Sequence, residues 1–283
     1  MYIDDFKGRY TTVPIAIYRA YFNTGTTEVI SHRHREIELI AITEGEAEVY
    51  IDSERYHARK GDVIVIAPHF IHRLSTSADS LTSYYCICFD PSLLSDTSLA
   101  EGLESNTMGL YGHICGDTNI GAVAIGNIER AFLAVENGYD GWELEAVGEI
   151  SLLFSRIKRE GYVTKSAPAR NKEREFGRTA MAYISEHFEE NITSSTLADA
   201  MFMNVSYFCR VFKQTFGCCF SEYLMEYRLQ AAAAKLRDSD LSVSDIAFGV
   251  GFNGSSYFTK SFKERFGETP CKYRKRNISN ISP

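Results

Sequence analysis

The chain has 283 residues, of which 45% are hydrophobic and 24% are charged, a composition that excludes a disordered chain and fits one large or two ordinary globular domains. The formal net charge of −7 argues weakly against a nucleic-acid binder until it is divided: residues 1–175 hold 17 basic and 26 acidic side chains, whereas residues 176–283 hold 13 and 11. The acidic excess therefore belongs to the first part of the chain, and the second part remains compatible with DNA.

Nothing in the sequence indicates export or membrane insertion. No apolar run reaches the roughly eighteen residues that a spanning helix needs, and the segment MYIDDFKGRY lacks the basic start and apolar stretch of a secretory signal. The seven cysteines are odd in number, scattered and without a CxxC pair. The sequence predicts a cytoplasmic protein with reduced thiols and no membrane partner.

Short stretches of alternating apolar and polar residues fill the region from about residue 12 to residue 90. The segment HRHREIELIAITEGEAEVYIDSERYHARKGDVIVIAP shows the alternation, which breaks at Glu44–Gly45, Asp52–Ser53 and Lys60–Gly61. Short strands with regular turns predict an all-β barrel or sandwich.

Three histidines and a glutamate in this region form the first candidate site. His32, His34 and Glu38 have equal parity and can share one face of a strand, and His72 can join them from a neighbouring strand. These groups suit a pocket that hydrogen-bonds a small effector, and they also suit a Zn, Fe, Mn or Ni ion. We favour the effector pocket, expect no metal and no cofactor, and keep a metal centre at these four residues as the alternative.

The same residues resemble the two cupin motifs. Residues 32–45 read His-x-His-x3-Glu-x6-Gly, as in the first motif, and residues 61–72 resemble the second. The resemblance implies a small antiparallel barrel of the jelly-roll type. His69 departs from the pattern, because cupins usually have a glycine near this position.

Apolar residues recur at helical spacing from about residue 124 to residue 160. The stripe consists of Ile128, Phe132, Val135, Leu144, Val147, Ile150, Leu153, Phe154 and Ile157. Breaks at Asn137–Gly138 and Asp140–Gly141 predict two helices, whose stripe suits either a partner helix or the surface of their own barrel. Residues 161–175 are polar and contain Pro168, so they predict a linker.

The most informative region is an internal repeat. VFKQTFG (Val211–Gly217) recurs as SFKERFG (Ser261–Gly267), and a shorter helical segment precedes each copy, LADAM from Leu197 and IAFGV from Ile246. A short helix, a tight turn and a longer helix make a helix-turn-helix unit. Two such units are predicted, and the glycine that closes each copy stands where a helix would end.

The helix starts carry capping residues. Ser242 with Asp245 predicts a variant capping box, and Asn204 and Asn253 are placed as N-caps of the two longer helices.

The longer helices have two distinct faces. Phenylalanines such as Phe208 and Phe258 are expected to pack inward. The opposite face carries small polar and basic residues: Ser206, Cys209, Arg210 and Lys213 in the first copy, and Ser255, Ser256, Thr259, Lys260 and Lys263 in the second. Such a face suits a helix in a DNA major groove, and it equally suits the solvated face of an ordinary bundle.

Residues 180–276 resemble the DNA-binding domain of the AraC/XylS family of bacterial regulators. The matching segments are YISEHF…ITSSTLADA, SYFCRVFKQTFG, FSEYLMEYRLQAAAAKL, LSVSDIAFGVGF and SSYFTKSFKERFGETPCKYR. The resemblance implies an all-α domain in which a long helix, here about residues 221–236, joins two helix-turn-helix units on one face of double-stranded DNA. It favours DNA binding over the solvated bundle.

Carried over by motif position, the resemblance implies the DNA-binding residues Asn204, Ser206, Tyr207, Cys209, Arg210, Lys213, Asn253, Ser255, Ser256, Thr259, Lys260 and Lys263. Arg210 is the first candidate for a base contact, because arginine can bind guanine through two hydrogen bonds.

The resemblance also implies how the parts cooperate. Residues 1–160 form a cupin-type domain for effector binding and dimerisation, residues 161–175 a linker, and residues 176–276 the DNA-binding domain. The effector is a metabolite such as a sugar, an N-terminal arm at about residues 1–14 covers the barrel mouth, and an activator would also contact RNA polymerase. We therefore expect a ligand-responsive, homodimeric transcription regulator without catalytic residues.

Two other functions compete with this one. The first is a cupin enzyme, such as a metal-dependent isomerase or oxygenase, with a regulatory tail. The second is an architectural DNA binder whose barrel only dimerises. The repeat favours DNA binding, which the enzyme hypothesis leaves unexplained.

Overall fold

The computed structural model describes residues 13–22, 28–52, 54–76, 81–165 and 171–279. The chain divides near Asn171 into two compact units, each with its own core. The predicted N-terminal arm falls outside the described residues, except for positions 13 and 14. Within the described ranges, no helix combines the length and the apolar character that crossing a membrane requires.

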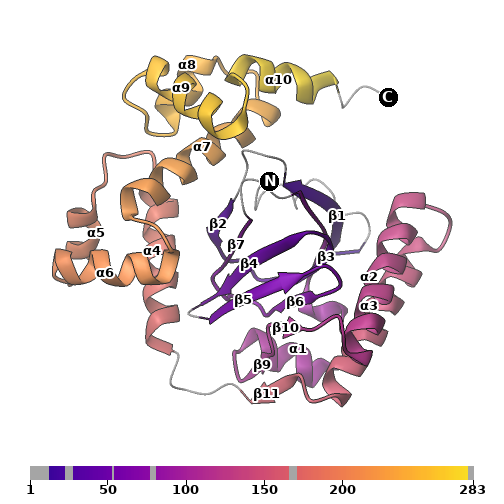
Figure 1. Ribbon diagram of the computed structural model, residues 1–283. Helices are drawn as coiled ribbons and strands as arrows, with labels where there is room; N and C mark the ends of the chain where they lie inside the picture. Colours follow the sequence, from indigo (N-terminus) through magenta and orange to yellow (C-terminus); the bar gives the residue numbers. More distant parts are fainter. Residues whose placement is uncertain (1–12, 23–27, 53, 77–80, 166–170, 280–283) are drawn as a thin grey trace. The chain divides into compact units, whose positions relative to one another are not determined.

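The first unit is built on two antiparallel sheets (Figure 1). The larger sheet has five strands in the order β1 (Ile15–Phe22), β8 (Thr82–Phe89), β3 (Ile37–Glu44), β6 (Val63–Ile66) and β10 (His113–Ile114). The smaller sheet has four, in the order β2 (Glu28–His32), β7 (His72–Ser75), β4 (Glu46–Ile51) and β5 (Glu54–Arg59). A further pair joins β9 (Met108–Leu110) to β11 (Val163–Lys165).

Alternation along the strands divides the side chains between two cores. In β3, Ile40 and Ile42 belong to a core that also takes Val49 and Leu74 from the smaller sheet, so this core lies between the sheets. Leu39 and its neighbours of equal parity point to the other face. The period of two thus builds a layered unit in which β3 is buried on both faces.

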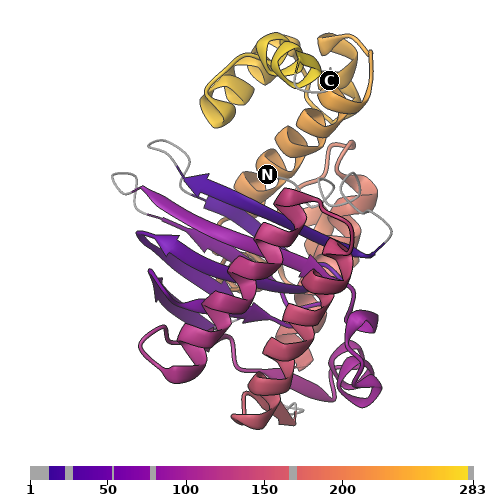
Figure 2. The ribbon, with the colours of Figure 1, turned by 90° about the vertical axis from the view of Figure 1, so that its right-hand side faces the viewer.

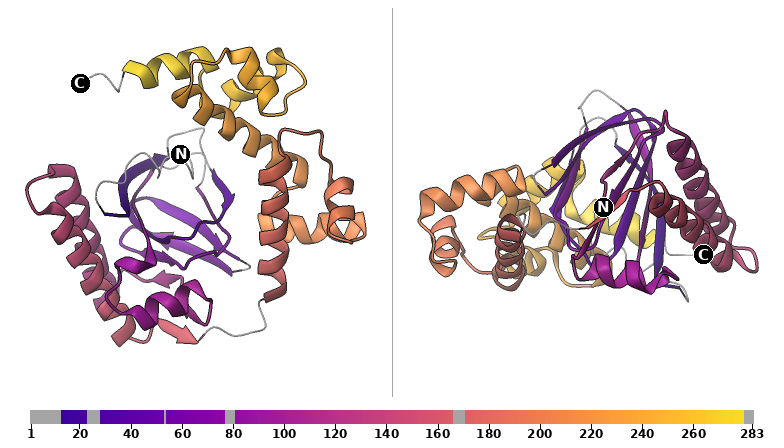
Figure 3. Two further views of the ribbon diagram at one scale, coloured as in Figure 1. Left: turned by 180° about the vertical axis from the view of Figure 1, so that it is seen from behind. Right: turned by 90° about the horizontal axis from the view of Figure 1, so that it is seen from below.

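Helices cover the outer face of the five-stranded sheet. The long helices α2 (Asn119–Asn137) and α3 (Trp142–Arg159) lie side by side along it (Figures 2 and 3). The helix α1 (Thr97–Glu104) contributes to the same core, after a 3-10 turn at Pro91–Leu93.

The apolar stripe of these helices serves mainly the unit's own sheet. Ile128, Ile150 and Phe154 are among the stripe residues buried in the outer core, whereas Leu144 is 81% exposed. Of the two alternatives that the sequence left open, covering the barrel therefore accounts for most of the stripe. The break between the helices lies where predicted, because Gly138 and Gly141 take the left-handed conformation that ends α2 and begins α3.

The second unit is helical (Figure 1). Its elements are α4 (Asn171–His187), α5 (Ser194–Ala200), α6 (Val205–Phe216), α7 (Phe220–Asp238), α8 (Val243–Gly249), α9 (Ser255–Phe266) and α10 (Pro270–Ser279). The pairs α5–α6 and α8–α9 are the two helix-turn-helix units that the repeat predicts, and α7 joins them.

Each helix-turn-helix unit is held by aromatic packing. Phe208 and Phe212 of α6 pack with ring centroids 5.5 Å apart, and Phe212 meets Tyr223 of α7. Phe258 and Phe262 repeat the pair in α9, again 5.5 Å apart. The duplicated sequence thus produces a duplicated core, because equivalent phenylalanines face inward in both copies.

The structure differs from the prediction in the region assigned to a linker. Within residues 161–175, Val163–Lys165 form strand β11, and α4 already begins at Asn171. Strand β11 is three residues long and pairs with the equally short β9, so neither strand has enough residues to show an alternating pattern.

Candidate functional site

Helix α6 has the features of a recognition helix. It begins after Asn204, whose side-chain oxygen accepts a hydrogen bond from the amide of Ser206 at 2.9 Å, so the predicted N-cap is present. It ends at Gly217, which has φ +80°. Its phenylalanines are buried and fix which face turns outward.

The predicted contact residues of α6 occupy that outward face. Ser206, Tyr207, Cys209, Arg210 and Lys213 are all exposed. The Arg210 guanidinium lies 5.2 Å from the ring centroid of Tyr207, a distance at which cation and ring attract.

Helix α9 begins one residue later than the sequence suggested. Gly254 is its N-cap, and no side chain caps it, so the prediction of Asn253 as the cap is wrong. Asn253 precedes the cap position and is exposed. Because the helix starts at Ser255, its first free amide groups lie one residue further along the chain than an N-cap at Asn253 would require.

The outward residues of α9 are unequally accessible. Ser256, Lys260 and Lys263 are exposed, whereas Ser255 and Thr259 are half-buried. The Lys260 ammonium lies 3.9 Å from a carboxylate oxygen of Glu264 one turn later, a loose surface pair that leaves the cation available.

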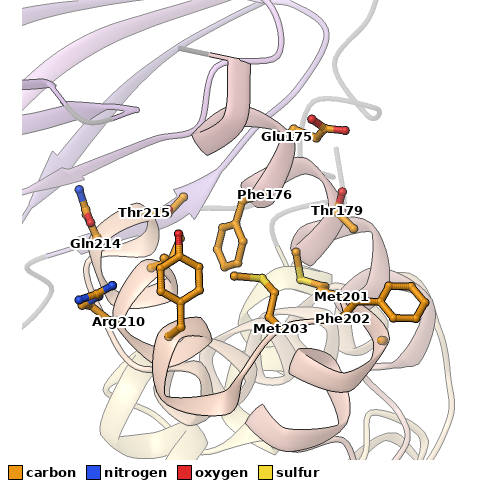
Figure 4. A pocket seen from close by; sticks show the side chains of 12 residues that line it. Glu175, Phe176, Thr179, Met201, Phe202, Met203, Arg210, Gln214 and Thr215 are labelled. Carbon is orange, nitrogen blue, oxygen red and sulfur yellow. The ribbon is translucent and has the colours of Figure 1, made fainter. Parts of the chain in front are cut away.

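A cavity of about 780 Å³, which the sequence did not reveal, lies beside α6 (Figure 4). Its walls come from α4, from the turn after α5 and from α6, and include Phe176, Met201, Met203 and Arg210. Phe202 in the turn is 99% exposed and has φ +54°, so this apolar ring points away from any core. A hollow lined by both apolar and polar side chains therefore borders the first recognition helix.

The four residues predicted for the effector pocket come together between the two sheets. We call His32, His34, Glu38 and His72 the histidine cluster. Ring centroids lie 4.1 Å apart for His32 and His72, 5.0 Å for His34 and His72, and 5.6 Å for His32 and His34. The strand arrangement brings these residues together: His32 and His72 pair across β2 and β7, and Glu38 lies on β3 of the other sheet.

Glu38 is the electrostatic centre of the histidine cluster. Its Oε2 atom lies 3.1 Å from Nε2 of His34 and 2.8 Å from Nε2 of His72. Burial acts to raise the pKa of Glu38, but its contacts with these two histidines outweigh burial and hold the pKa well below the usual range. The cluster therefore keeps a buried carboxylate ionised.

The histidines respond differently to the same environment. Burial, reinforced by the neighbouring His72, lowers the pKa of His32 well below its usual value. Burial acts in the same direction on His34, but the hydrogen bond to Glu38 prevails and raises the pKa of His34.

Two buried thiols adjoin the cluster, and the sequence reasoning missed them as site residues. The Cys86 thiol donates a hydrogen bond to Oε1 of Glu38 at 3.0 Å, and Cys88 lies 3.8 Å from Cys86, sulfur to sulfur. Burial is the main cause that raises the pKa of Cys86 to about 12. A signal was available in the sequence, because Cys86 and Cys88 have equal parity and therefore share one face of β8. Placing that face beside Glu38 required knowing that Glu38 of β3 pairs with Cys88 of β8.

His69 shows what the departure from the cupin pattern means locally. It has φ +66°, in the left-handed region that favours glycine, and its amide donates to the carbonyl of His34 at 2.8 Å. The turn into β7 therefore keeps the backbone shape that the motif requires, despite the side chain.

Comparison with known proteins agrees with both halves of this description. Residues 14–111 match the family described as AraC-like ligand binding domain, and residues 197–276 match the family described as helix-turn-helix domain. A crystal structure of apo ToxT from Vibrio cholerae shares the fold, with a TM-score of 0.50 and 15% identity over 94% of this chain and 98% of that one.

Two relatives align along nearly their whole length. The uncharacterized HTH-type transcriptional regulator YdeC of Bacillus subtilis is 23% identical over 274 residues, 95% of this chain and 94% of that protein. The melibiose operon regulatory protein of Escherichia coli is 22% identical over 280 residues, 94% and 92% of the two chains. The chain belongs to the AraC family of helix-turn-helix transcriptional regulators, a family of DNA-binding regulators and not of enzymes, with an N-terminal AraC-like ligand-binding domain.

Proposed function

We propose that this regulator reads a specific DNA sequence with α6 and α9, and that a small molecule bound by its β-sheet unit controls the reading. The observation that carries the proposal is the pair of helix-turn-helix units, each presenting polar and basic side chains at the outward face of its second helix. A helix of this kind brings its first turns to base edges in the major groove.

The residues divide by the contacts they can make. Arg210 can bind the two acceptors of guanine at once, and Lys260 can reach one of them. Ser206 and Ser256 offer single hydrogen bonds near the helix starts, and Cys209 adds little more than an apolar contact. Lys213 and Lys263 lie further along the exposed faces and suit phosphates, which position the protein without reading sequence.

The effector site is assigned to the histidine cluster, in which four polar side chains from both sheets come together in the described part of the first unit. One relative is named for a melibiose operon, so a sugar is a candidate effector. Whatever its identity, an effector changes DNA binding only through unequal affinity for two arrangements of the protein.

A homodimer is part of the proposal. Leu133 on α2 and Leu144 and Leu152 on α3 are half-exposed or more, although these helices pack most of their other apolar residues into the core on the sheet. Exposed leucines on one helix pair suit the same helices of a second copy. As an activator, the dimer would in addition contact RNA polymerase.

The proposal is tested by sequencing genomic fragments that the purified protein retains at about 150 mM salt, because electrostatic binding to DNA depends steeply on salt. An Arg210→Ala, Lys260→Ala double variant is run in parallel, with Arg178→Ala, Lys235→Ala as a control of equal charge loss away from α6 and α9.

Specific regulation predicts a few enriched sites that the control keeps and the double variant loses. Uniform retention that is the same for all three proteins would mean electrostatic binding alone, as in an architectural binder, and would refute sequence reading. If specific sites are enriched, the functions of the genes beside them would suggest candidate effectors.

A further inference from the structure

The guanidinium of Arg210 lies beside an aromatic ring. Tyr207 precedes Arg210 by three residues on α6, a spacing that puts two side chains on the same face of a helix. The guanidinium carbon lies 5.2 Å from the centroid of the Tyr207 ring, and both residues are exposed. The residue one turn after Arg210 is the neutral Gln214, so the sequence offers no acidic partner at that position. The ring is therefore the neighbour on α6 that can orient the guanidinium.

The equivalent lysine of α9 has other neighbours. Lys260 follows Tyr257 by three residues, but the Tyr257 ring packs against Phe252, with ring centroids 6.1 Å apart. One turn after Lys260 the sequence has Glu264, whose carboxylate oxygen lies 3.9 Å from the ammonium. The two copies of the repeat thus place different groups beside their basic residue, a ring in α6 and an acid in α9.

Arg210 also has room to move. It lines the hollow of about 780 Å³ beside α6, and Figure 4 shows it with Gln214 at one side of that hollow. A long side chain at an open edge loses conformational entropy when DNA fixes it in one orientation. An aromatic ring attracts a guanidinium through the face of the ring, which leaves the N–H groups free for the two acceptors of guanine, whereas a carboxylate would occupy them.

We propose that Tyr207 is a positioning residue, whose ring holds the Arg210 guanidinium in place for guanine and so increases the base discrimination of α6. This role differs from the direct DNA contact that the motif position implied for Tyr207. The inference rests on the proposed function, because Tyr207 can position Arg210 for a base only if Arg210 reads one. In α9 the equivalent tyrosine packs elsewhere, so the inference concerns α6 alone.

The test uses the full chain and a DNA site that the wild type selects from a random pool, in which each base pair is then replaced in turn. The discrimination ratio is the affinity for the selected site divided by the affinity for the replaced one, and Arg210→Ala identifies the base pair whose ratio depends on Arg210. Tyr207→Leu should lower that same ratio about two- to fivefold, the size of one exposed contact between a cation and a ring, and leave the other ratios unchanged.

Two further variants separate the ring from other roles of Tyr207. Tyr207→Phe keeps the ring and should retain the wild-type ratio within about twofold. In an Arg210→Ala background, Tyr207→Leu should change no ratio, because the residue that it positions is gone. Tyr257→Leu is the matched control, since it removes the equivalent ring of α9 and should leave the ratio that depends on Arg210 unchanged.

Three outcomes would overturn the inference alone. A wild-type ratio in Tyr207→Leu would show that Arg210 needs no ring. Equal weakening on every sequence would mean that the ring supports α6 or a phosphate contact and not base reading. A loss in Tyr207→Phe as large as in Tyr207→Leu, or a loss that persists without Arg210, would assign Tyr207 a direct DNA contact. A fourth outcome, unchanged ratios at every base pair in Arg210→Ala, would refute base reading by Arg210 itself and the inference with it.

Discussion

Asp62 illustrates how one buried carboxylate joins distant parts of the first unit. It accepts hydrogen bonds from the amides of Arg59 and Gly116 at 2.9 and 2.7 Å, and from the ring of His113 at 2.9 Å. Burial acts to raise the pKa of Asp62, but these donors prevail and lower it. The turn before β6 and the segment after β10 are therefore fastened through a charged acceptor.

We predict that Asp62→Asn lowers the free energy of unfolding by about 1–3 kcal/mol at pH 7, because an amide replaces a charged acceptor. The folded state holds the proton less tightly than the unfolded state, so the carboxylate stabilises fully above the unfolded pKa of about 3.9 and loses this effect as pH falls through the folded pKa. Urea unfolding at pH 7 and at a series of lower pH values should show that the difference in the free energy of unfolding between wild type and Asp62→Asn becomes smaller as the pH falls. Asp117→Asn, at an exposed position, is the control, and a difference independent of pH would contradict the assignment.

Gly251 occupies a position that admits no side chain. Its φ is +86°, and an added Cβ would lie 2.7 Å from the carbonyl oxygen of Phe188 and 2.8 Å from Nε of Arg228, two atoms that share a hydrogen bond. The hydrogen bond ties α7 to the end of α4.

Gly251→Ala should therefore lower the free energy of unfolding by at least about 1–3 kcal/mol, from backbone strain alone. Gly249→Ala is the neighbouring control, because its Cβ would meet only the Lys235 ammonium at 4.0 Å, and it should change stability by less than about 1 kcal/mol. Equal effects in thermal unfolding would show that the turn adapts.

At this scale the sequence predicted the histidine cluster as a set. The cupin pattern was sufficient for His32, His34 and Glu38, but the prediction from parity that they share one strand is wrong: His32 ends β2, Glu38 lies on β3 of the other sheet, and His34 lies between the two strands. The pattern did not reveal Cys86, because a contact between β3 and β8 depends on strand register, which a single sequence does not contain.

At the scale of elements, the two recognition helices share a sequence but not a cap. Asn204 caps α6 with its side chain, whereas α9 starts at Gly254 without a side-chain cap. Asn204 and Gly254 occupy equivalent positions of the repeat, but only Asn204 caps its helix with a side chain.

We predict that Asn204→Ala lowers stability by about 0.5–2 kcal/mol, as the loss of an N-cap does, and that Asn253→Ala changes it by no more than about 0.5 kcal/mol. Denaturant unfolding without DNA separates this effect from any role in DNA binding. A loss of equal size in both variants would mean that Asn253 stabilises the turn in another way.

Elements were predictable where their pattern was long. The helix pairs α5–α6 and α8–α9 follow from a repeat, a capped start and a closing glycine, and α2 and α3 from a stripe of many residues. The strands β9, β10 and β11 have two or three residues each, too few for any periodicity, and their existence depends on partners far away in the chain.

At the scale of the whole molecule, the exposed leucines of α2 and α3 carry the expectation of a dimer. Leu144 is 81% exposed and Leu152, two turns later on the same helix, 52%. Burial of such side chains against a second copy would stabilise a dimer by roughly 1.5–3 kcal/mol each when complete.

We predict that Leu144→Asp, Leu152→Asp shifts the chain toward the monomer in sedimentation equilibrium, without a change in the melting temperature of the monomer. Leu241→Asp, at a leucine of similar exposure in the second unit, is the control. A wild-type chain that is monomeric at every concentration would show that α2 and α3 do not form a dimer interface.

If α6 and α9 read separate segments of one DNA site, selection of bound sequences from a random pool should distinguish the two segments. Wild type, Arg210→Ala and Lys260→Ala are compared in the same buffer. We expect Arg210→Ala to lose preference at one segment, at a cost of about 1–3 kcal/mol per affected base pair, and Lys260→Ala to lose it at a second segment about one helical turn away. Loss at the same positions in both variants, or equal weakening on all sequences, would contradict this expectation.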